Sequence, residues 1–218
     1  MTICVIPAWN ESRNIAKVIA AIKPFFDKII VVDDGSGDDT AEIAENSGAV
    51  VLRHIMNRGQ GAALRTGTDF ALTLGADIIV HFDADGQFLA GDIPAMLAPL
   101  KNEVDIVFGS RFLEKKSAMP LIKSALAMPL ARLINRVFLD VRTTDPQCGF
   151  RAFTRLAASR IRWRQDDMAH CSEILSAASR SGLRLAEVPI TVSYTRFGSG
   201  LGRGLKILKD LFLGSLIR

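Results

Sequence analysis

The sequence is poor in cysteine and lacks any long apolar run. Its 218 residues contain three cysteines, an odd number without C-x-x-C or other metal-site spacing, at Cys4, Cys148 and Cys171. A disulfide framework or a zinc site is therefore not expected, and a reducing cytosol fits this cysteine usage. A membrane-spanning helix needs about 20 mostly apolar residues in a row. Because charged residues interrupt the most suspicious stretch, residues 117–141, no span is expected.

Leader, repeat and linker signals are also absent. The N-terminus begins in a short strand-like segment without a basic region, so no signal peptide is expected. Apolar residues make up 49% of the chain and charged residues 23%, a balance that excludes intrinsic disorder. Because no repeat or low-complexity linker divides the sequence, we expect a single domain over residues 1–218.

The formal net charge of +4 conceals an uneven distribution. Residues 1–110 hold 8 Lys and Arg against 15 Asp and Glu, whereas residues 111–164, which we call the basic belt, hold 12 against 3. The basic belt lacks interleaved aromatic residues and any nucleic-acid-binding motif, so nucleic acid is not an expected partner. Its charges belong either to solvated helix faces or to a surface for a membrane or a phosphate-bearing substrate. The apolar residues between the charges favour the second interpretation.

Short β-branched segments alternate with helix-like segments in the first half of the chain. Strands buried on both faces are predicted at residues 2–7, 29–33, 49–53, 78–82 and 104–108. Amphipathic helices are predicted at residues 14–22, 39–45, 61–74 and 93–100. This alternation predicts βαβ units with right-handed crossovers, and hence a three-layer α/β fold with a mainly parallel central sheet.

The alternation ends after residue 110. A loop is predicted at residues 145–153, helices at 156–161 and 172–181, a strand at 184–194, and a short amphipathic helix at 204–218. Residues 119–139 have basic amphipathic helical spacing interrupted at Pro129. We therefore expect a basic helical insertion in the α/β domain.

Polar residues follow each of the five predicted strands of the first half. Ligands of parallel sheets bind outside the carboxyl ends of the strands, so the chemistry is expected there. Asp83 and Asp85 form a D-x-D turn with Gln87 beside it. Hard oxygen ligands of this kind hold Mg²⁺ or Mn²⁺ and leave positions for substrate phosphates. Asp33 and Asp34 either form a turn or accept hydrogen bonds from a base or ribose.

Seven motifs stand in one order along the chain. They read IPAWNE, VVDDGSGDDT, NRGQGAALRTG, DADGQF, GSRF, DPQCGFRAF and EVPITVSYTR. In this order and spacing they resemble the GT-A glycosyltransferases of family 2, and within them the dolichyl-phosphate mannose synthase and polyprenyl-phosphate hexosyltransferase group. The resemblance covers nearly the whole chain. It implies a GT-A fold with a nucleotide-sugar-binding half, residues 1–110, and an acceptor-binding half with amphipathic helices, residues 111–218.

The resemblance implies an inverting transfer from a nucleotide-diphospho-sugar, a GDP- or UDP-hexose, with Mg²⁺ or Mn²⁺ as cofactor. Matched motif by motif, the residues implied to bind the nucleotide sugar are Pro7, Trp9, Glu11, Val32, Asp34, Asp83, Ala84, Asp85, Gln87 and Arg196. Among them, Val32 and Asp34 are implied to contact the base and ribose, and Asp85 and Gln87 to be the metal ligands. Trp9 stands where the group usually has Tyr or Phe.

Two further positions depart from the group's pattern. Gln60 stands where Lys is frequent, which removes a charge near the donor and leaves Arg58 or Arg65 as substitutes. The usual Ser-Lys after the arginine that closes on the diphosphate, Arg196, is missing, and a replacement of that lysine by Arg203 is left open.

The acceptor side rests on fewer residues. Arg111, in the GSRF motif, matches the group's acceptor-phosphate arginine, and a guanidinium fork suits a pair of phosphate oxygens. A structural ion pair is the alternative role. Arg132 and Arg136 lie on one helical face and either extend this anion site or are solvated. Asp145 is expected to orient the acceptor, to act as a base or to cap a turn. Together with Asp85, Arg111 and Asp145 are the predicted catalytic residues.

These expectations combine into one predicted function. The chain is expected to transfer a hexose, mannose or glucose, from a nucleotide sugar to a polyprenyl or dolichyl phosphate, as a peripheral enzyme on the cytosolic face of the membrane. A phosphate monoester has a second pKa near 6 and is already nucleophilic at neutral pH. The alternatives are a family 2 transferase acting on a saccharide or other hydroxyl acceptor in cell-envelope polysaccharide synthesis, and a catalytically silent nucleotide-sugar-binding subunit. A membrane-spanning partner subunit that presents the acceptor is also considered.

Overall fold

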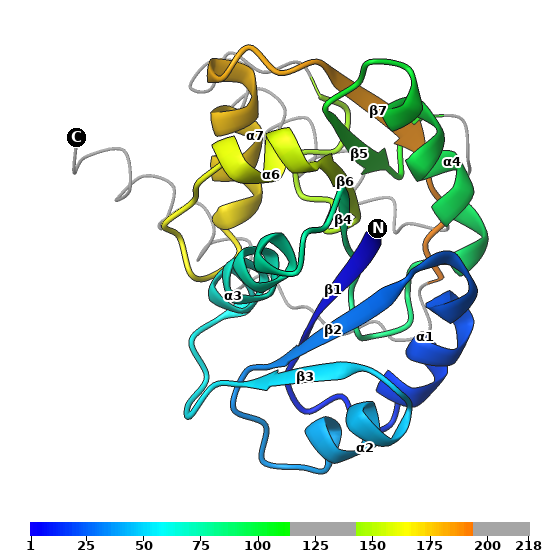
Figure 1. Ribbon diagram of the computed structural model, residues 1–218, viewed down its shortest axis with the longest axis vertical. Helices are drawn as coiled ribbons and strands as arrows, with labels where there is room; N and C mark the ends of the chain where they lie inside the picture. Colours follow the sequence, from blue (N-terminus) through cyan, green and yellow to red (C-terminus); the bar gives the residue numbers. More distant parts are fainter. Residues whose placement is uncertain (114–142, 194–218) are drawn as a thin grey trace, which may run out of the picture.

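The computed structural model describes residues 1–113 and 143–193. In these residues seven strands form one sheet in the order β3-β2-β1-β4-β6-β5-β7 (Figure 1). The strands are β1 (Thr2–Ala8), β2 (Lys28–Asp33), β3 (Val50–Arg53), β4 (Ile78–His81), β5 (Ile106–Ser110), β6 (Arg151–Thr154) and β7 (Leu185–Pro189). Strand β6 runs antiparallel to its neighbours β4 and β5, and the other pairings are parallel. The predicted mainly parallel sheet is confirmed.

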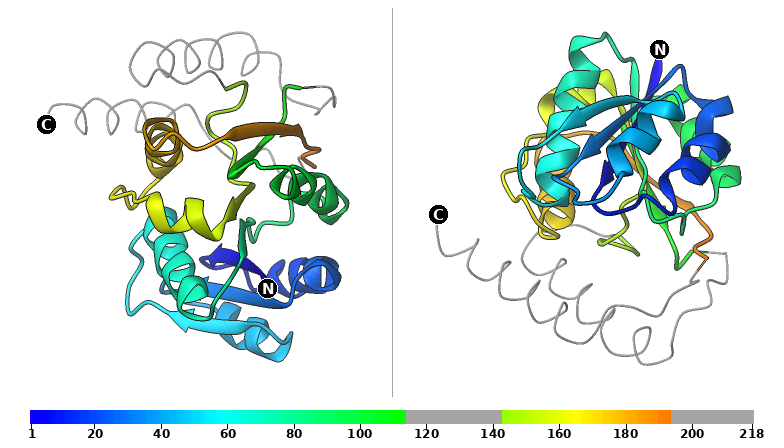
Figure 2. Two further views of the ribbon diagram at one scale, coloured as in Figure 1. Left: turned by 45° about the horizontal axis from the view of Figure 1, so that its top comes forward. Right: turned by 90° about the horizontal axis from the view of Figure 1, so that it is seen from below.

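Helices cover both faces of the sheet. One face packs against α1 (Ile15–Ile22), α2 (Thr40–Asn46) and α4 (Ile93–Leu97), and the other against α3 (Gln60–Thr73), α6 (Arg155–Arg160) and α7 (His170–Arg180). Short 3₁₀ helices are η1 (Lys23–Phe25), η2 (Ala90–Asp92) and η3 (Ala98–Lys101). Figure 1 shows α3, α6 and α7 on one side of the strands and α1 and α4 on the other, and the views of Figure 2 agree. The arrangement is the predicted three-layer α/β fold.

Alternating side chains of the central strands fill two separate cores. In β1, Ile3 and Val5 point to the α3 side, whereas Cys4 and Ile6 point to the α1 side, and all four are 0% exposed. A strand covered on both faces needs apolar residues at every position, which is why β1 reads as one continuous apolar run. Helix α3 packs closely here, since a Cβ at Gly67 would lie 2.3 Å from Val5 Cγ1.

Two strand predictions were wrong in part. Residues 49–53 were expected to be buried on both faces, but β3 is an edge strand and its Val50 is 39% exposed. Residues 145–153 were expected to be a loop, but their last three residues belong to β6, which lies between β4 and β5. A strand of four residues is too short to show periodicity, and its partners are distant in the sequence. Within the predicted strand 184–194, only β7 pairs with β5, and Val192 forms an isolated bridge with Phe88.

Several predictions concern residues outside the described ranges. They are the amphipathic segments 119–139 and 204–218, the predicted anion-site residues Arg132 and Arg136, and the diphosphate-loop residues Arg196 and Arg203. None of the helices in residues 1–113 and 143–193 has the length and apolar character that a membrane crossing requires.

Candidate active site

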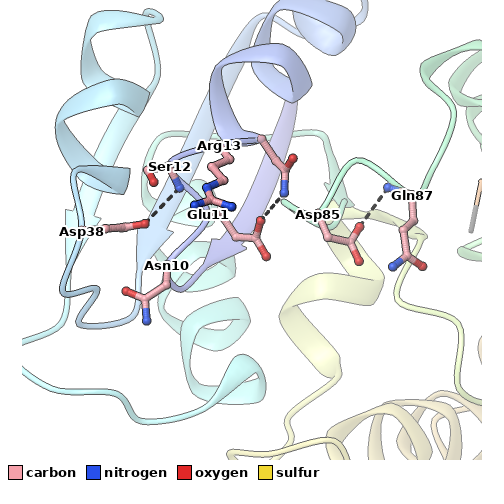
Figure 3. Close-up of a pocket in the computed structure, with 8 residues that line it drawn as sticks. Asn10, Glu11, Ser12, Arg13, Asp38, Asp85 and Gln87 are labelled. Carbon is pink, nitrogen blue, oxygen red and sulfur yellow. Dashed lines mark hydrogen bonds between the residues drawn. The ribbon is translucent and has the colours of Figure 1, made fainter. Parts of the chain in front are cut away.

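A pocket of about 560 Å³ lies at the edge of the sheet where β1, β2 and β4 end. It is lined by Asn10, Glu11, Ser12, Arg13, Asn14, Asp38, Asp85 and Gln87 (Figure 3). These residues follow three strands that are parallel neighbours, so their carboxyl ends bring the residues together although they are far apart in the sequence. The fold therefore brings three predicted site residues, Glu11, Asp85 and Gln87, into one pocket.

The wall of the pocket after β1 is held by hydrogen bonds to the turn after β2. The Glu11 backbone N–H donates to the Thr40 hydroxyl at 2.8 Å, and the Glu11 carboxylate accepts a hydrogen bond from Asn14 Nδ2 at 2.7 Å. Asn10 has a positive φ of 56°, and its Oδ1 accepts a hydrogen bond from the Gly37 N–H at 2.9 Å. The left-handed backbone at Asn10, which asparagine tolerates better than most residues, turns the chain away from β1 toward α1.

The other predicted residues of this strand have different surroundings. Pro7 is buried within β1, opposite Val32 of β2. Trp9, by contrast, is 54% exposed just beyond the strand end. Its indole is therefore accessible to a ligand, while Pro7 supports the strand from inside.

Val32 and Asp34 belong to the framework. Val32 is 0% exposed in the core beneath α3. The Asp34 carboxylate is nearly buried and accepts hydrogen bonds from the backbone N–H groups of Arg58 and Gly59, the shortest at 2.7 Å, while His54 Nδ1 lies 2.6 Å from Oδ1. Neither side chain lines the pocket. Asp34 fastens the loop between β3 and α3. The contact of Val32 and Asp34 with base and ribose stays a prediction.

The D-x-D turn follows β4 directly. Asp83 Oδ1 accepts a hydrogen bond from Gln60 Nε2 at 2.9 Å, and Asp85 Oδ1 accepts one from the Gln87 backbone N–H at 2.9 Å. Ala84, between the two acids, is 4% exposed and packs in the core. The buried Ala84 fixes the turn, so that Asp85 and Gln87 face the pocket.

Both acids of this turn have raised pKa values. Burial, together with the negative charge of Asp85, raises the pKa of Asp83 to about 7. Burial also raises the pKa of Asp85, against the effect of the Gln87 N–H, which stabilises the carboxylate. A cation bound near two neighbouring carboxylates stabilises their ionised forms and so lowers their pKa values. Asp85, the amide of Gln87 and the nearby Glu11 supply oxygen donors only, the ligand type of Mg²⁺ and Mn²⁺. The residues present therefore fit a divalent metal completed by diphosphate oxygens, although the described residues contain no cluster of three His, Cys, Asp or Glu.

Arg111 and Asp145 form a two-pronged ion pair at the end of β5. Arg111 Nε donates to Asp145 Oδ2 at 2.5 Å and Nη2 donates to Oδ1 at 2.7 Å, and the Arg111 backbone N–H adds a third bond at 3.1 Å. The Asp145 side chain is fully buried, while that of Arg111 is 20% exposed. The ion-pair role considered for Arg111 is present.

Glu187 of β7 holds the loop that carries Asp145. Its carboxylate accepts hydrogen bonds from the backbone N–H of Thr144 at 2.9 Å and from the hydroxyl groups of Thr143 and Thr144. Sequence reasoning missed Glu187, His54 and the buried Arg151. A charged residue directly before the VPI segment was the one available signal for Glu187, and the GFR triplet was the signal for Arg151.

The residues considered as substitutes for the missing lysine are already engaged or lie elsewhere. Gln60 itself reaches Asp83, as described above. Arg65 pairs with Asp166 at 2.5 Å and donates to the Trp163 carbonyl, so its charge is already neutralised. Arg58 has an exposed side chain. In this structure a neutral amide contacts Asp83 where the resembled group frequently has a lysine.

Residues 3–162 match the family model described as Glycosyl transferase family 2. The chain belongs to this family. One relative is the UDP-N-acetylglucosamine–dolichyl-phosphate N-acetylglucosaminyltransferase of Methanococcus voltae. Its sequence is 34% identical to this chain over 231 residues, which cover 95% of this chain and 92% of that protein. The polyprenol monophosphomannose synthase of Mycolicibacterium smegmatis is 28% identical over 97% of this chain and 84% of that protein.

Among solved structures, the family 2 chain is similar to glucosyl-3-phosphoglycerate synthase from Mycobacterium tuberculosis in complex with Mn²⁺, uridine diphosphate and phosphoglyceric acid. The TM-score is 0.76 at 24% identity, over 97% of this chain and 77% of that one. The predicted GT-A fold is confirmed.

Proposed function

We propose that this family 2 glycosyltransferase moves a hexose from a nucleotide-diphospho-sugar to a polyprenyl phosphate at the cytosolic face of the membrane. The observation that carries the proposal is the pocket that unites Asp85 and Gln87 of the D-x-D turn with Glu11 at the ends of β4 and β1. Relatives named for transfer to dolichyl phosphate and for polyprenol monophosphomannose synthesis support the acceptor class.

The donor is assigned to this pocket. Asp85 and Gln87 would hold Mg²⁺ or Mn²⁺, which would neutralise the departing diphosphate and so stabilise the transition state. Trp9 offers an exposed aromatic face for the nucleotide base, and Arg13, the one basic residue among those lining the pocket, is suited to the diphosphate charge. Residues 1–110 thus form the donor half of the proposed enzyme, with Asp83 supporting the turn that carries Asp85.

The acceptor phosphate is assigned to Arg111. Its guanidinium plane is fixed by the buried Asp145 and its side chain is 20% exposed, which preorganises the group for phosphate oxygens. Asp145 has both carboxylate oxygens on Arg111 and no exposed surface. This favours the orienting role of Asp145 over the role of general base.

The reaction then needs orientation more than base catalysis. An oxygen of the acceptor phosphate attacks the anomeric carbon of the sugar, the new C–O bond forms as the bond to the diphosphate oxygen breaks, and configuration inverts. The nucleoside diphosphate leaves with the electron pair. Because the attacking phosphate is already anionic near neutral pH, no proton has to be removed by the protein.

A panel of nucleotide sugars tests the proposal. Purified protein with Mn²⁺ or Mg²⁺ is incubated with GDP-mannose, UDP-glucose or UDP-N-acetylglucosamine, each with and without a polyprenyl phosphate, and products are identified by mass spectrometry. A polyprenyl-phosphate hexose is the expected product. Transfer to a saccharide hydroxyl alone, or nucleotide binding without turnover under all conditions, would overturn the proposal in favour of the hydroxyl-acceptor or silent-subunit alternatives.

A further inference from the structure

Arg151 carries a guanidinium charge in the protein interior. The residue is 1% exposed, and neither Nη1 nor Nη2 has a hydrogen-bond partner within residues 1–113 and 143–193. The neighbouring His81 is equally buried. Its Nε2 lies 2.9 Å from the Thr68 hydroxyl, and its Nδ1 has no partner in the same ranges. Buried charged groups are normally paired because an unpaired one is costly, so the charge of Arg151 calls for a physical role.

The sheet register brings Arg151 near the D-x-D turn. In the antiparallel pair of β4 and β6, His81 lies opposite Arg151. Continuing this register by two residues brings Asp83 opposite Gly149, and the contact of the Phe82 and Phe150 rings, with centroids 5.1 Å apart, agrees with that continuation. Arg151 is therefore the diagonal neighbour of Asp83 on the same face. Diagonal neighbours are within reach of long side chains in antiparallel sheets.

Gly149 shows where the Asp83 carboxylate lies. A Cβ at Gly149 would be 2.8 and 2.9 Å from the two Asp83 carboxylate oxygens, closer than real Cβ contacts allow. The carboxylate thus lies across the glycine, on the side of the strand from which the Arg151 side chain extends. The same carboxylate accepts a hydrogen bond from the neutral Gln60 amide at 2.9 Å.

We propose that Arg151 is a positioning residue of the donor site, whose buried charge holds the Asp83 carboxylate in place over Gly149. The glycine provides the space and the arginine provides the charge. This accounts for the glycine and the arginine of the GFR triplet. Because Gln60 carries no charge, the buried Arg151 is the more important charged neighbour of the Asp83 carboxylate. The kinetic consequences of this inference rest on the proposed function, whereas the electrostatic coupling of the two residues does not.

The Cys171 thiol is the competing neighbour for the Arg151 charge. Its Sγ lies 3.6 Å from His170 Nε2 at the start of α7, on the same side of the sheet as Arg151. If the thiol were the sole partner of the guanidinium, the loss of Asp83 would leave the contribution of Arg151 unchanged. The test therefore has to separate Asp83 from Cys171.

A double-mutant cycle of unfolding tests the pairing without any substrate. Asp83→Asn, Arg151→Met and the double variant are unfolded in urea at pH 8 with the wild type. Asp83→Asn is expected to raise the equilibrium constant of unfolding in both backgrounds. We expect this increase to be at least tenfold larger when Arg151 is present than in the Arg151→Met background. Arg151→Gln takes the place of Arg151→Met if that variant does not fold.

Two matched cycles control for general damage to the sheet. Phe153→Leu alters a residue that is 1% exposed in the same strand, two positions from Arg151, and is expected to combine additively with Asp83→Asn. Cys171→Ser is combined with Arg151→Met in the same way. Additive behaviour of Asp83→Asn with Arg151→Met overturns the inference, whether or not Cys171 couples to Arg151.

Turnover measurements separate positioning from folding. With nucleotide sugar and polyprenyl phosphate, Arg151→Met is expected to lower kcat/KM at least tenfold, Arg151→Lys less than threefold, and Arg151→Met in the Asp83→Asn background less than threefold. Gly149→Ala, which displaces the carboxylate with Arg151 intact, is expected to resemble Arg151→Met. Equal losses in both Asp83 backgrounds would contradict positioning through Asp83. If the wild type turns over no nucleotide sugar, the proposed function fails and the unfolding cycle still decides the pairing.

Discussion

Arg111 and Asp145 lie 34 residues apart in the sequence and are joined by two parallel hydrogen bonds, from Nε to Oδ2 and from Nη2 to Oδ1. The pair connects the end of β5 to the loop before β6, and Glu187 of β7 fixes that loop from behind. Three strands therefore determine the orientation of one guanidinium group. A cation fixed in this way recognises a planar pair of oxygens without paying the entropy of ordering its side chain.

Arg111→Ala is predicted to separate acceptor binding from donor binding. The variant leaves the buried Asp145 carboxylate without its partner, so the free energy of unfolding should fall by about 3 kcal/mol. Transfer to polyprenyl phosphate should fall at least tenfold, while nucleotide-sugar affinity measured by calorimetry stays within about threefold of the wild type. Arg111→Lys serves as the control, because it keeps the charge and loses the fork. Lost donor affinity with ordinary acceptor kinetics would instead assign Arg111 to the diphosphate.

Metal removal is predicted to abolish transfer. EDTA should eliminate activity and added Mn²⁺ or Mg²⁺ should restore it, and Asp85→Asn should lower kcat by at least about a hundredfold, because one lost charged ligand costs several kcal/mol of transition-state stabilisation. Asp39→Asn is a matched control, since Asp39 is an exposed acid that does not line the pocket. Undiminished turnover by Asp85→Asn in EDTA would remove the metal role.

Metal affinity is also predicted to depend on pH. Burial and the neighbouring Asp85 raise the pKa of Asp83 to about 7, and burial raises that of Asp85. A cation binds the ionised acids, so binding releases protons, and affinity should weaken as the pH falls below about 7. Calorimetry of Mn²⁺ binding in the presence of nucleoside diphosphate, repeated in buffers of different ionisation enthalpy, measures the proton release. No release at pH 6 would show that the acids are already ionised.

The Cys171 thiol is predicted to make stability rise with pH. Burial alone would raise its pKa, but the positive charges of Arg151 and His170 outweigh burial and lower the pKa from its ordinary 9.0 to about 6. Between these values the native thiol is ionised and the unfolded thiol is protonated. Unfolding then takes up a proton, and stability increases with pH by at most about 1.4 kcal/mol per pH unit.

Urea unfolding between pH 6 and 9 checks this sign. The difference in unfolding free energy between the wild type and Cys171→Ala should widen as the pH rises through this window. For Cys4→Ala the difference should stay constant up to about pH 8.5, because burial raises the pKa of Cys4 well above its ordinary value. Parallel curves for the wild type and Cys171→Ala would mean that the native thiol keeps its proton.

Local patterns revealed the layers of the fold better than the side-chain pairings of the site. The first five strands each form an apolar run between helix-like segments, so their positions and their parallel direction could be predicted from local pattern. Strand β6 could not, because its partners β4 and β5 precede it by tens of residues and it reverses the direction of the sheet. At the site, the motifs singled out Asp85 and Gln87, which the structure places in one pocket. They could not show that His54 and the loop after β3 already engage Asp34, since that engagement depends on a contact across the crossover from β2 to β3.

Membrane binding is predicted to depend on the basic belt and on salt. A long-chain polyprenyl phosphate is reached only at a bilayer surface, and the belt combines a net charge of +9 with apolar residues at helical spacing. Each basic residue near an anionic leaflet contributes about 1 kcal/mol to membrane binding, and the contribution falls as salt screens it.

Flotation with liposomes that contain anionic lipid should show reversible binding of the protein at low salt. This binding should be lost at high salt and weakened by charge reversal at Lys115, Lys116 and Lys123. Charge reversal at the exposed Lys17, Lys28 and Lys101 is the matched control and should have little effect, because these lysines lie in the acidic half. Efficient formation of lipid-linked product without any flotation at low salt would contradict the prediction and indicate a membrane-spanning partner that presents the acceptor.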